Sequence, residues 1–485
     1  MAYEAVIGLE CHLQLRTRSK MFCECPAGFG ADPNSNVCPV CLGLPGALPV
    51  ANRAAIEGSL RLGLALDSAI RSESVFARKH YFYPDMPKNY QITQYDRPLC
   101  EGGALPVTIA GEERRFELIR IHIEEDTGKS FHPERVGDRR VSRVDFNRAG
   151  VPLLEIVTRP VFGEPAEAAA FLTALRRLAR WLQISDADME KGQLRCDANV
   201  SLRPVGAPEL GTKTELKNLN SIKGVEKGLT AEIARQRRVL EGGGRIEQAT
   251  LLYDADHDKL AVMRTKEHAH DYRYFPEPDL PVLEVVDAWR DRVAAELPEL
   301  PWARERRLVA QYGLRPYDAA VLTDSRELAD YFEEAARGNP EPKVIANWVM
   351  GEVLGHVNRE RITIDEWAQK VSPAAFRTIV EATQTAQATA MGGKSHLEEV
   401  FKHGADPNKI FVTHRAEGSR DELLPLIKDV IRDNPGPVQQ YLAGKSQTFG
   451  FLVGQVMKRS EGRAVPQRVQ ELLREELGRH ASAES

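Results

Sequence analysis

The sequence contains no run of about 18 consecutive apolar residues, the length that a membrane-spanning helix requires. Its N-terminus has neither a basic segment followed by an apolar core nor a region rich in Arg and Ser, so we expect neither a secretory signal nor a transit peptide. We therefore expect a cytoplasmic protein with no membrane partner. Thiols stay reduced in the cytoplasm, which argues against disulfides in the stretch Met21–Gly43, where four of the seven cysteines lie.

The chain also has no excess of positive charge, because its formal net charge is -5 over 485 residues. That balance excludes a uniformly basic nucleic-acid coat, so any contact with RNA must use a local patch. There is no low-complexity tract and no repeat of fixed period. The length predicts two to four domains of an ordinary globular protein.

A phosphate-binding loop of the Walker type is missing as well. The letters GKS occur three times, but the Walker pattern needs a glycine five residues before the first of them. Those positions hold Ile123, Ala388 and Gln439. If the protein uses ATP, the nucleotide must therefore bind at a site built from a sheet and a metal ion.

Four of the cysteines lie close together near the N-terminus. Cys23 and Cys25 form one pair, Cys38 and Cys41 form a second, and twelve residues rich in turn formers separate the pairs. Two such hooks can bind zinc with four sulfurs, and a site filled by four thiolates has no open position for chemistry. We predict a structural zinc ion here. The alternative is four unligated thiols.

Strand-like patterns dominate from residue 1 to about 290, where we expect two helices, over 164–183 and 225–240. The second helix should end at Gly242-Gly243-Gly244. The stretch Tyr274–Val285 is rich in proline, so we expect extended chain that leads to a domain boundary.

Helical patterns dominate after about residue 290, and Gly392-Gly393 together with His403–Lys409 indicates a subdivision. The predicted fold class is α+β, with an antiparallel sheet first and all-α parts after it. The predicted domains are a sheet domain with a cysteine knuckle at 23–41, a helical domain and a tail, at 1–292, 293–405 and 406–485.

Four predicted strands carry charged or amide side chains on one face. Alternation places Glu10 and His12 on the same polar face of the first strand, while Cys11 between them faces the core. The other strands contribute Arg195, Asp197, Asn199, Glu215, Glu124 and Glu125. Carboxylates are the ligands that Mg²⁺ accepts, and interleaved cations suit a transferred phosphoryl group. The alternative is an ordinary solvated sheet face.

Aromatic and basic residues alternate in the stretch Phe76–Asp96, which includes Lys79. Aromatic rings can stack on unpaired bases while cations bind phosphates, so this stretch suits a single-stranded RNA end. Pro84 and Pro87 favour a shaped loop between two strands. A packed aromatic strand pair is the alternative.

These segments, taken together, resemble the GatB family, the B subunit of the glutamine-dependent aspartyl/glutamyl-tRNA amidotransferase. The similar segments are long, occur in order and span nearly the whole chain; they include "VIGLECHLQL", "RKHYFYPDMPKNYQITQYD", "HIEEDTGKS", "DFNRAGVPLLEIVTRP", "LRCDANVSLRP" and "GFLVGQVMK".

The resemblance implies a ligase that uses ATP and Mg²⁺ to phosphorylate the side-chain carboxylate of Glu-tRNA(Gln) or Asp-tRNA(Asn). Ammonia then displaces phosphate and gives Gln-tRNA(Gln) or Asn-tRNA(Asn). The implied partners are an amidase subunit that supplies ammonia through a tunnel, a small third subunit that completes a heterotrimer, and the tRNA, with no DNA. The implied fold of residues 1–292 is a catalytic domain similar to glutamine synthetase and guanidino kinases.

Residue roles follow from the same resemblance. It implies that Glu10, His12 and Glu125 bind magnesium and take part in phosphoryl transfer, and that Lys79 and Glu125 lie at the tunnel mouth. The implied neighbours that bind the cofactors are Glu124, Arg195, Asp197, Asn199 and Glu215. Cys23, Cys25, Cys38 and Cys41 match the zinc form of the family.

The tail carries a local excess of positive charge, +4 over residues 441–468, which predicts binding to the body of the tRNA. A solvated helix face is the alternative there. For the whole chain, the rival hypothesis is a non-catalytic RNA-binding scaffold held together by zinc. That scaffold would not explain carboxylates on four strands.

Overall fold

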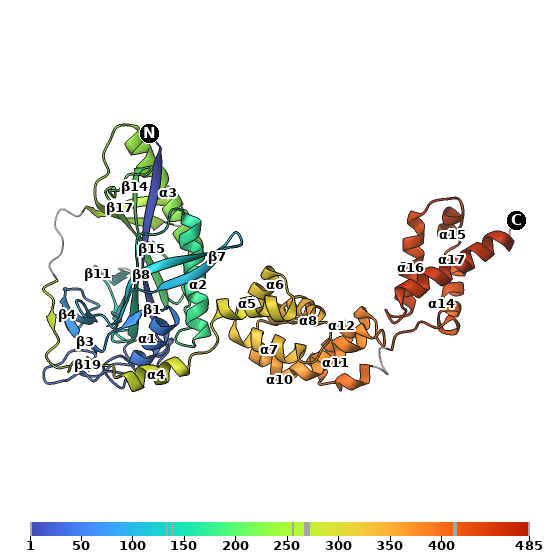
Figure 1. Ribbon diagram of the computed structural model, residues 1–485, viewed down its shortest axis with the longest axis horizontal. Helices are drawn as coiled ribbons and strands as arrows, with labels where there is room; N and C mark the ends of the chain where they lie inside the picture. Colours follow the sequence, from blue (N-terminus) through green and yellow to red (C-terminus); the bar gives the residue numbers. More distant parts are fainter. Residues whose placement is uncertain are drawn as a thin grey trace. The chain divides into compact units, whose positions relative to one another are not determined.

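The computed structural model of the chain describes residues 2–131, 134–136, 139–254, 257–265, 272–410 and 415–483. The chain forms two compact units, Met1–Trp302 and Ala303–Ser485. Strands occur in the first unit, and the described elements of the second are helical (Figure 1). This arrangement confirms the predicted α+β class with all-α parts after the sheet.

The first unit is built on one large sheet, with strands in the order β17-β16-β15-β14-β1-β13-β8-β6-β2 and with β7 paired to β8. All pairs are antiparallel except β15 with β16. The strands of this sheet are β1 (Tyr3–Gln14), β2 (Ala69–Ile70), β6 (Cys100–Glu101), β7 (Ala104–Ile109), β8 (Glu112–Glu125), β13 (Pro152–Thr158), β14 (Leu194–Pro204), β15 (Thr214–Leu219), β16 (Ala249–Asp254) and β17 (Lys259–Thr265).

Smaller sheets accompany the large one. β18 (Phe275–Pro276), β4 (Phe76–His80) and β5 (Tyr90–Gln94) form a three-stranded sheet. The two-stranded pairs are β3 (Glu73–Ser74) with β19 (Leu283–Glu284), β9 (Lys129–Ser130) with β12 (Val144–Asp145), and β10 (Glu134–Val136) with β11 (Arg139–Val141). The proline-rich stretch Tyr274–Val285 therefore contains short strands that pair back onto the first unit.

Helices α2 (Pro165–Trp181) and α3 (Ile222–Glu241) confirm the two predicted helices of the first unit. Figure 1 shows both helices along the same side of the large sheet. The prediction missed α1 (Arg53–Ala65) and the short α4 (Asp287–Ala295). The signal for α1 was present, because the side chain of Asn52 caps it by accepting from the backbone N–H groups of Ala54 and Ala55.

Alternation along β1 divides its side chains between a core and a polar face. Ile7, Leu9, Cys11 and Leu13 are buried, and the residues between them are partly exposed. The buried set packs in one cluster with the apolar face of α2, which presents Leu175 and Leu178 among others. Cys11 lies in this core, as predicted. The opposite face of the sheet is therefore left for polar side chains.

The second unit contains two hydrophobic clusters, one formed by α5 to the end of η2 and the other by α14 to α17. The elements of the first cluster are α5 (Pro301–Tyr312), α6 (Pro316–Leu322), α7 (Arg326–Ala336), α8 (Pro342–Trp348), the π-helix η1 (Val349–Val353), α9 (Leu354–Glu360), α10 (Ile364–Lys370), α11 (Pro373–Gln384), α12 (Ala390–His403) and the 3₁₀ helix η2 (Pro407–Lys409). Those of the second are α14 (Arg420–Asp433), α15 (Pro435–Leu442), α16 (Gln447–Arg459) and α17 (Pro466–Ala483).

The predicted break at Gly392-Gly393 is wrong, because both glycines lie inside α12. Thr389 caps this helix, and a Cβ on Gly393 would come within 2.6 Å of the side chain of Thr383. Gly393 therefore permits close packing between α11 and α12. The helix ends instead at Gly404, which has the left-handed conformation that favours glycine. None of the helices in the described ranges is both long and apolar enough to span a bilayer.

The core under β1 predicts a stability effect in the first unit. Leu175→Ala removes a fully buried side chain between α2 and the sheet and should lower the free energy of unfolding by about 2–5 kcal/mol. Thr173→Ala on the exposed face of the same helix is the matched control and should change it by less than about 0.5 kcal/mol. Chemical denaturation followed by circular dichroism measures both, and equal effects would contradict this description of the core.

Candidate functional site

The polar face of the large sheet carries a row of charged and imidazole side chains across four strands. Strand register places His122 of β8 opposite Glu155 of β13, Glu155 opposite His12 of β1, and His12 opposite Arg195 of β14. Residues directly opposite each other on antiparallel strands share a face and lie close together. The pairing register therefore assembles this row from segments that are far apart in the sequence.

Carboxylates converge on His12. Its Nε2 atom lies 3.6 Å from Glu155 Oε2, 3.8 Å from Glu124 Oε1 and 3.9 Å from Glu10 Oε1. One potential ligand atom each from Glu10, His12 and Glu155 lies within 4.8 Å of the others, and His122, Glu124 and Glu155 form a second such group. Oxygen-rich sets of this kind suit Mg²⁺.

Two members of the row, Glu155 and His122, were missed by sequence reasoning. A signal existed for each. Glu155 is the one charged residue in the mostly apolar strand β13, and His122 alternates with Glu124 along β8. Neither observation indicates proximity to His12, because that depends on strand order, which a single sequence does not give.

Burial and mutual repulsion shift the pKa values in this row. Burial and the nearby Glu155 raise the pKa of Glu124 to about 7. Burial disfavours the charged form of His12, but the nearby carboxylates of Glu155 and Glu124 raise its pKa to about 9. Burial lowers the pKa of His122 to about 4, so this imidazole is neutral. Perturbed groups that share one face are typical of functional sites.

Glu125 belongs to neither carboxylate group in the described part of the chain. It follows Glu124 on β8, so strand alternation turns its side chain away from His12. Its Oε1 atom pairs with the ammonium group of Lys88 and accepts a hydrogen bond of 2.9 Å from the backbone N–H of Ile92. The structure therefore brings Glu10 and His12 together but leaves Glu125 apart from them.

Lys79 of β4 lies on the side of Glu124 rather than that of Glu125. Burial disfavours its charge, but Glu124 and Glu155 raise the pKa of the ammonium group above its ordinary value. Its Nζ atom lies 5.1 Å from the centroid of the Tyr272 ring. Lys79 is therefore a cation at the edge of the carboxylate row.

The row continues onto β14 and β15. Asp197 lies opposite Glu10, and the ammonium group of Lys217 bridges Asp197 and Glu215. Glu215 also accepts a hydrogen bond of 2.8 Å from Thr250. Asn199 lies opposite both Gly8 and Glu215, one step farther along the same face. These predicted neighbours of the cluster therefore share its face of the sheet.

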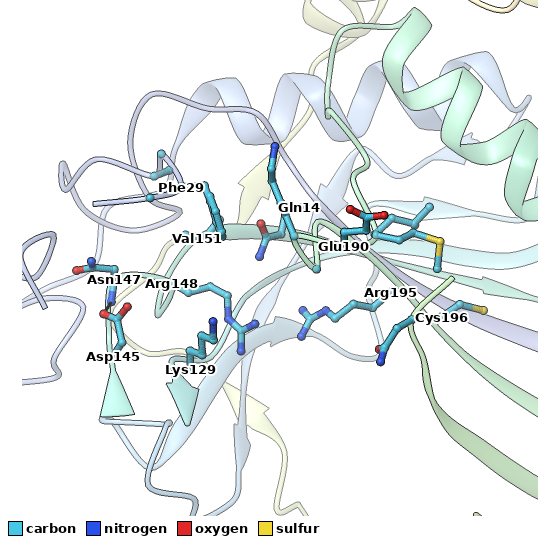
Figure 2. Close-up of a pocket in the computed structure, with 18 of the residues that line it drawn as sticks. Gln14, Phe29, Lys129, Asp145, Asn147, Arg148, Val151, Glu190, Arg195 and Cys196 are labelled. Carbon is cyan, nitrogen blue, oxygen red and sulfur yellow. Dashed lines mark hydrogen bonds between the residues drawn. The ribbon is translucent and has the colours of Figure 1, made fainter. Parts of the chain in front are cut away.

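A cavity of about 720 Å³ adjoins this end of the row. Its lining comes from β1, β14, the loop before β13 and the loop between the two cysteine pairs, and it includes Arg195 and Asp197. Figure 2 shows Lys129, Arg148 and Arg195 directed toward the middle of the cavity, while the sulfur of Cys196 points away. The volume lies in the range of small-molecule sites.

Asp126 orients this cationic wall. It accepts hydrogen bonds of 2.9 Å from Arg195 and 2.6 Å from Gln14, and Arg148 lies 3.7 Å away. Although burial opposes its charge, Arg195 and Arg148 hold the pKa of Asp126 below its ordinary value. The Nε atom of Arg195 is buried and has no hydrogen-bond partner among the described residues. A buried donor without a partner is costly, so this atom favours an anionic ligand in the cavity.

The four cysteines near the N-terminus come together as predicted. The sulfurs of Cys23, Cys25, Cys38 and Cys41 lie within 4.8 Å of one another, and all four are free thiols. Tetrahedral zinc with bonds of roughly 2.3 Å needs sulfurs roughly 3.8 Å apart, so this cluster fits one metal ion. The neighbouring Cys23 thiol, the backbone N–H of Cys38, which donates to Cys41 Sγ at 3.2 Å, and the nearby Lys20 lower the pKa of Cys41 to about 4.

Lys20 links the cysteine cluster to the rest of the site. It is fully buried, and its ammonium group donates to the backbone carbonyls of Asn36 at 2.8 Å and Phe146 at 3.2 Å and lies 3.6 Å from Cys41 Sγ. Residues 27–31 of the intervening loop line the cavity described above. The cluster therefore fixes a loop that forms one wall of that cavity.

The sheet of β18, β4 and β5 has two kinds of aromatic surface. Arg78 lies 4.3 Å from the centroid of Tyr90 and donates two hydrogen bonds of 2.7 Å to the buried Glu277, so this part is packed. Phe82 and Tyr83, in the loop between β4 and β5, are largely exposed. In the stretch Phe76–Asp96, the strands around Arg78 are therefore packed, while the loop with Phe82 and Tyr83 offers an exposed surface for stacking.

Comparison with known proteins gives a consistent result along the chain. Residues 5–291 match the family model described as the GatB/GatE catalytic domain, and residues 330–477 match the GatB domain. Relatives named as the B subunit of aspartyl/glutamyl-tRNA(Asn/Gln) amidotransferase include those of Carboxydothermus hydrogenoformans, Moorella thermoacetica and Chlorobium chlorochromatii. Each is 48% identical over 479 residues, which cover 98% of this chain and at least 99% of the relative. On this evidence the chain belongs to the GatB family.

Proposed function

We propose that this chain is the GatB component of an aspartyl/glutamyl-tRNA(Asn/Gln) amidotransferase, a ligase that forms an amide with nitrogen derived from glutamine. Its substrates are Glu-tRNA(Gln) and Asp-tRNA(Asn), and ATP supplies the phosphoryl group that activates the side-chain carboxylate. The row of carboxylate and imidazole groups beside a cationic cavity is the observation that carries this proposal. The near full-length similarity to relatives of that name supports it.

Phosphorylation is needed because a carboxylate is a poor acyl donor. A side-chain oxygen of the esterified Glu or Asp attacks the γ-phosphorus, and ADP leaves. Ammonia then attacks the activated carbonyl carbon, phosphate leaves, and a side-chain amide results. The acyl phosphate would hydrolyse in water, so the site must exclude water and ammonia must arrive by a dry path.

The residues that would hold Mg²⁺ are Glu10, His12 and Glu155, whose ligand atoms lie within 4.8 Å of one another, with Glu124 3.8 Å from His12 as a further carboxylate. This set keeps Glu10 and His12 from the sequence prediction and favours Glu155 and Glu124 over Glu125. When bound, Mg²⁺ would neutralise charge on the phosphates of the nucleotide. Asp197 and Glu215 hold Lys217 beside this set and balance part of its charge.

The cations of the cavity would bind the phosphates. Arg195 offers a buried donor without a partner among the described residues, and Arg148 and Lys129 point into the same space (Figure 2). Arg148 donates to the backbone carbonyls of Thr127 and Gly128, and Arg195 donates to Asp126, so both guanidinium groups are fixed before ligand binds. Fixed cations stabilise charge that develops during phosphoryl transfer.

We assign the supply of ammonia to an amidase subunit, which joins this chain and a small third subunit in a heterotrimer. The ammonia would enter near Lys79 and Glu125. Lys79 lies at the edge of the carboxylate row, and Glu125 lies on the face of β8 that points away from this row. The cytoplasm stays the expected compartment.

The tRNA would make two kinds of contact. The exposed rings of Phe82, Tyr83 and Tyr95 suit stacking on the unpaired 3′ end. The tail would bind the tRNA body, although three of its cations have acid partners: Arg459 pairs with Asp433, Arg463 with Glu417 and Arg468 with Glu471. The exposed Lys445 and Lys458 are then the residues most suited to contact phosphates.

A non-catalytic RNA-binding scaffold is the rival hypothesis. It would need the cysteine cluster and the exposed aromatic residues, but it has no use for the buried or partly buried acids and imidazoles around His12, since buried charges lower stability. An assay of tRNA-dependent ATP hydrolysis by the assembled complex separates the two hypotheses, because a scaffold cannot catalyse this reaction.

The cysteine cluster predicts bound zinc. Cys38→Ser should abolish stoichiometric zinc, measured by elemental analysis of protein purified without chelator, and should lower the free energy of unfolding by a few kcal/mol. Cys100→Ser is the matched control, because Cys100 is buried outside the cluster, and it should keep the metal. Wild-type protein that contains no zinc would end this prediction.

The carboxylate row predicts a separation of two activities. Glu10→Ala, His12→Ala and Glu155→Ala should each reduce tRNA-dependent phosphate release from ATP by at least 100-fold, while glutamine hydrolysis by the partner amidase stays measurable. Glu125→Ala, measured in the same assay, tests the assignment of Glu125 to magnesium binding that was made from the sequence. Full amide formation by the first three variants would refute the proposed centre.

Lys79 offers a different test in the same assay. Lys79→Ala should impair amide formation from glutamine more than amide formation from added ammonium, because the expected role lies in ammonia delivery. Equal loss with both nitrogen sources would contradict that role and place Lys79 with the phosphoryl-transfer residues.

The tail predicts an effect on binding alone. Removing residues 411–485 keeps the described buried residues of the first cluster of the second unit, since the last of them is Ile410. The Michaelis constant for aminoacyl-tRNA should rise tenfold or more, about 1.4 kcal/mol per decade, with kcat within a few-fold. Lys445→Ala with Lys458→Ala should reduce the salt dependence of binding. An unchanged Michaelis constant in a folded truncation would contradict a tRNA-binding tail.

A further inference from the structure

His122 has an environment unlike that of His12, although both imidazoles lie beside Glu155. The guanidinium Nε of Arg120 donates to His122 Nδ1 at 3.2 Å. On the other side of the ring, His122 Nε2 lies 3.5 Å from Glu155 Oε2 and 3.9 Å from Glu124 Oε2. The terminal nitrogen of Arg120 also reaches Glu155 Oε1 at 3.5 Å. Arg120, His122 and Glu155 therefore form a closed polar ring.

The contact with Arg120 fixes the protonation of the imidazole. A guanidinium group is a donor only, so it must meet the lone pair of Nδ1. The single proton of the neutral ring is then on Nε2, and the nearer of the two carboxylates beside that nitrogen is Glu155, with Oε2 3.5 Å away. A nitrogen that carries a proton has no lone pair for a metal ion, and the lone pair of Nδ1 is already used. In this arrangement neither nitrogen of His122 can ligate a cation.

The two imidazoles also differ in access. The side chains of His12 and Glu10 are 19% and 36% exposed, while those of His122, Glu155 and Glu124 are 4%, 7% and 3% exposed. A magnesium ion that bridges the protein to substrate phosphates keeps several positions for water and substrate. Such an ion suits the accessible side at His12 and not the closed side at His122.

We propose that His122 is a positioning residue, which places its protonated Nε2 beside Glu155 and so holds this carboxylate toward His12, and that His12 alone supplies nitrogen to the metal. The inference rests on the metal centre of the proposed function. The group of Glu10, His12 and Glu155 is then the metal site, and His122 in the neighbouring group supports it. Arg120 is the residue that selects the tautomer of His122.

Manganese, which substitutes for magnesium and is paramagnetic, tests this assignment. Pulsed EPR of the full-length chain loaded with Mn²⁺ should detect coupling to one imidazole nitrogen in the wild type. That coupling should persist in His122→Gln and disappear in His12→Gln, which is the matched control. The dissociation constant of Mn²⁺ should rise by roughly 10–100-fold in His122→Ala, as expected when a group that supports a ligand is lost.

The conservative variant separates positioning from general damage. The Gln side chain keeps an N–H donor where Nε2 lies, so His122→Gln should return the dissociation constant to within a few-fold of the wild type. Arg120→Met, which removes the group that selects the tautomer, should weaken Mn²⁺ binding and provides a second variant if His122→Ala fails to fold.

Three results would overturn the inference. Loss of the nitrogen coupling in His122→Gln would make His122 a ligand, and an unchanged dissociation constant in His122→Ala would remove its supporting role. If the wild type shows no nitrogen coupling, or shows one that persists in His12→Gln, the metal centre of the proposed function is refuted, and this inference with it. The second result leaves the proposed function intact, so the two failures are distinguishable.

Discussion

The pairing of β1 with β13 on one side and β14 on the other is the constraint on which the site depends. This register places His12 between Glu155 and Arg195 and Glu10 beside Asp197. Side chains alternate with a period of two, so a slip of one residue would move these polar groups into the core and the apolar residues of β1 out of it. The same apolar packing that stabilises the first unit therefore also fixes the geometry of the polar face.

Much of this arrangement follows from local patterns. Alternation in β1 predicts the shared face of Glu10 and His12, helical spacing predicts α2 and α3, and cysteine spacing predicts the cluster. Each of these is a property of a few neighbouring residues. The missed helix α1 has a capping residue but contains two glycines, which weaken a helical pattern. The two glycines of α12 led to the wrong prediction of a break for a related reason. Gly393 permits close packing against α11, and the sequence of α12 alone does not reveal that neighbouring helix.

The remainder depends on contacts between distant segments. Glu155 and His122 could not be grouped with His12 from sequence, because nothing local gives the strand order β8-β13-β1. The tail cations have a local net charge, but their acid partners lie on other segments or the next turn of helix, so the local count overstated the available charge. Glu125 shows a second limit of sequence analysis, because residues adjacent in sequence, such as Glu124 and Glu125, lie on opposite faces of a strand.

The buried carboxylates of the row lower the stability of the fold, and neighbouring cations offset only part of this cost. Glu124 and Glu155 are buried close to one another, and the loss of hydration costs several kcal/mol for each buried ion. Lys79, Arg120 and the imidazole of His12 offset some of this repulsion.

The two cationic side chains Lys79 and Arg120 lie at the edge of the row, so repulsion between Glu10, Glu124 and Glu155 persists around His12. A divalent cation at that point would relieve the repulsion, and a cluster that is unfavourable without metal will bind it more tightly. Residual electrostatic strain in the fold would then contribute to the affinity for the Mg²⁺ ion of the proposed function.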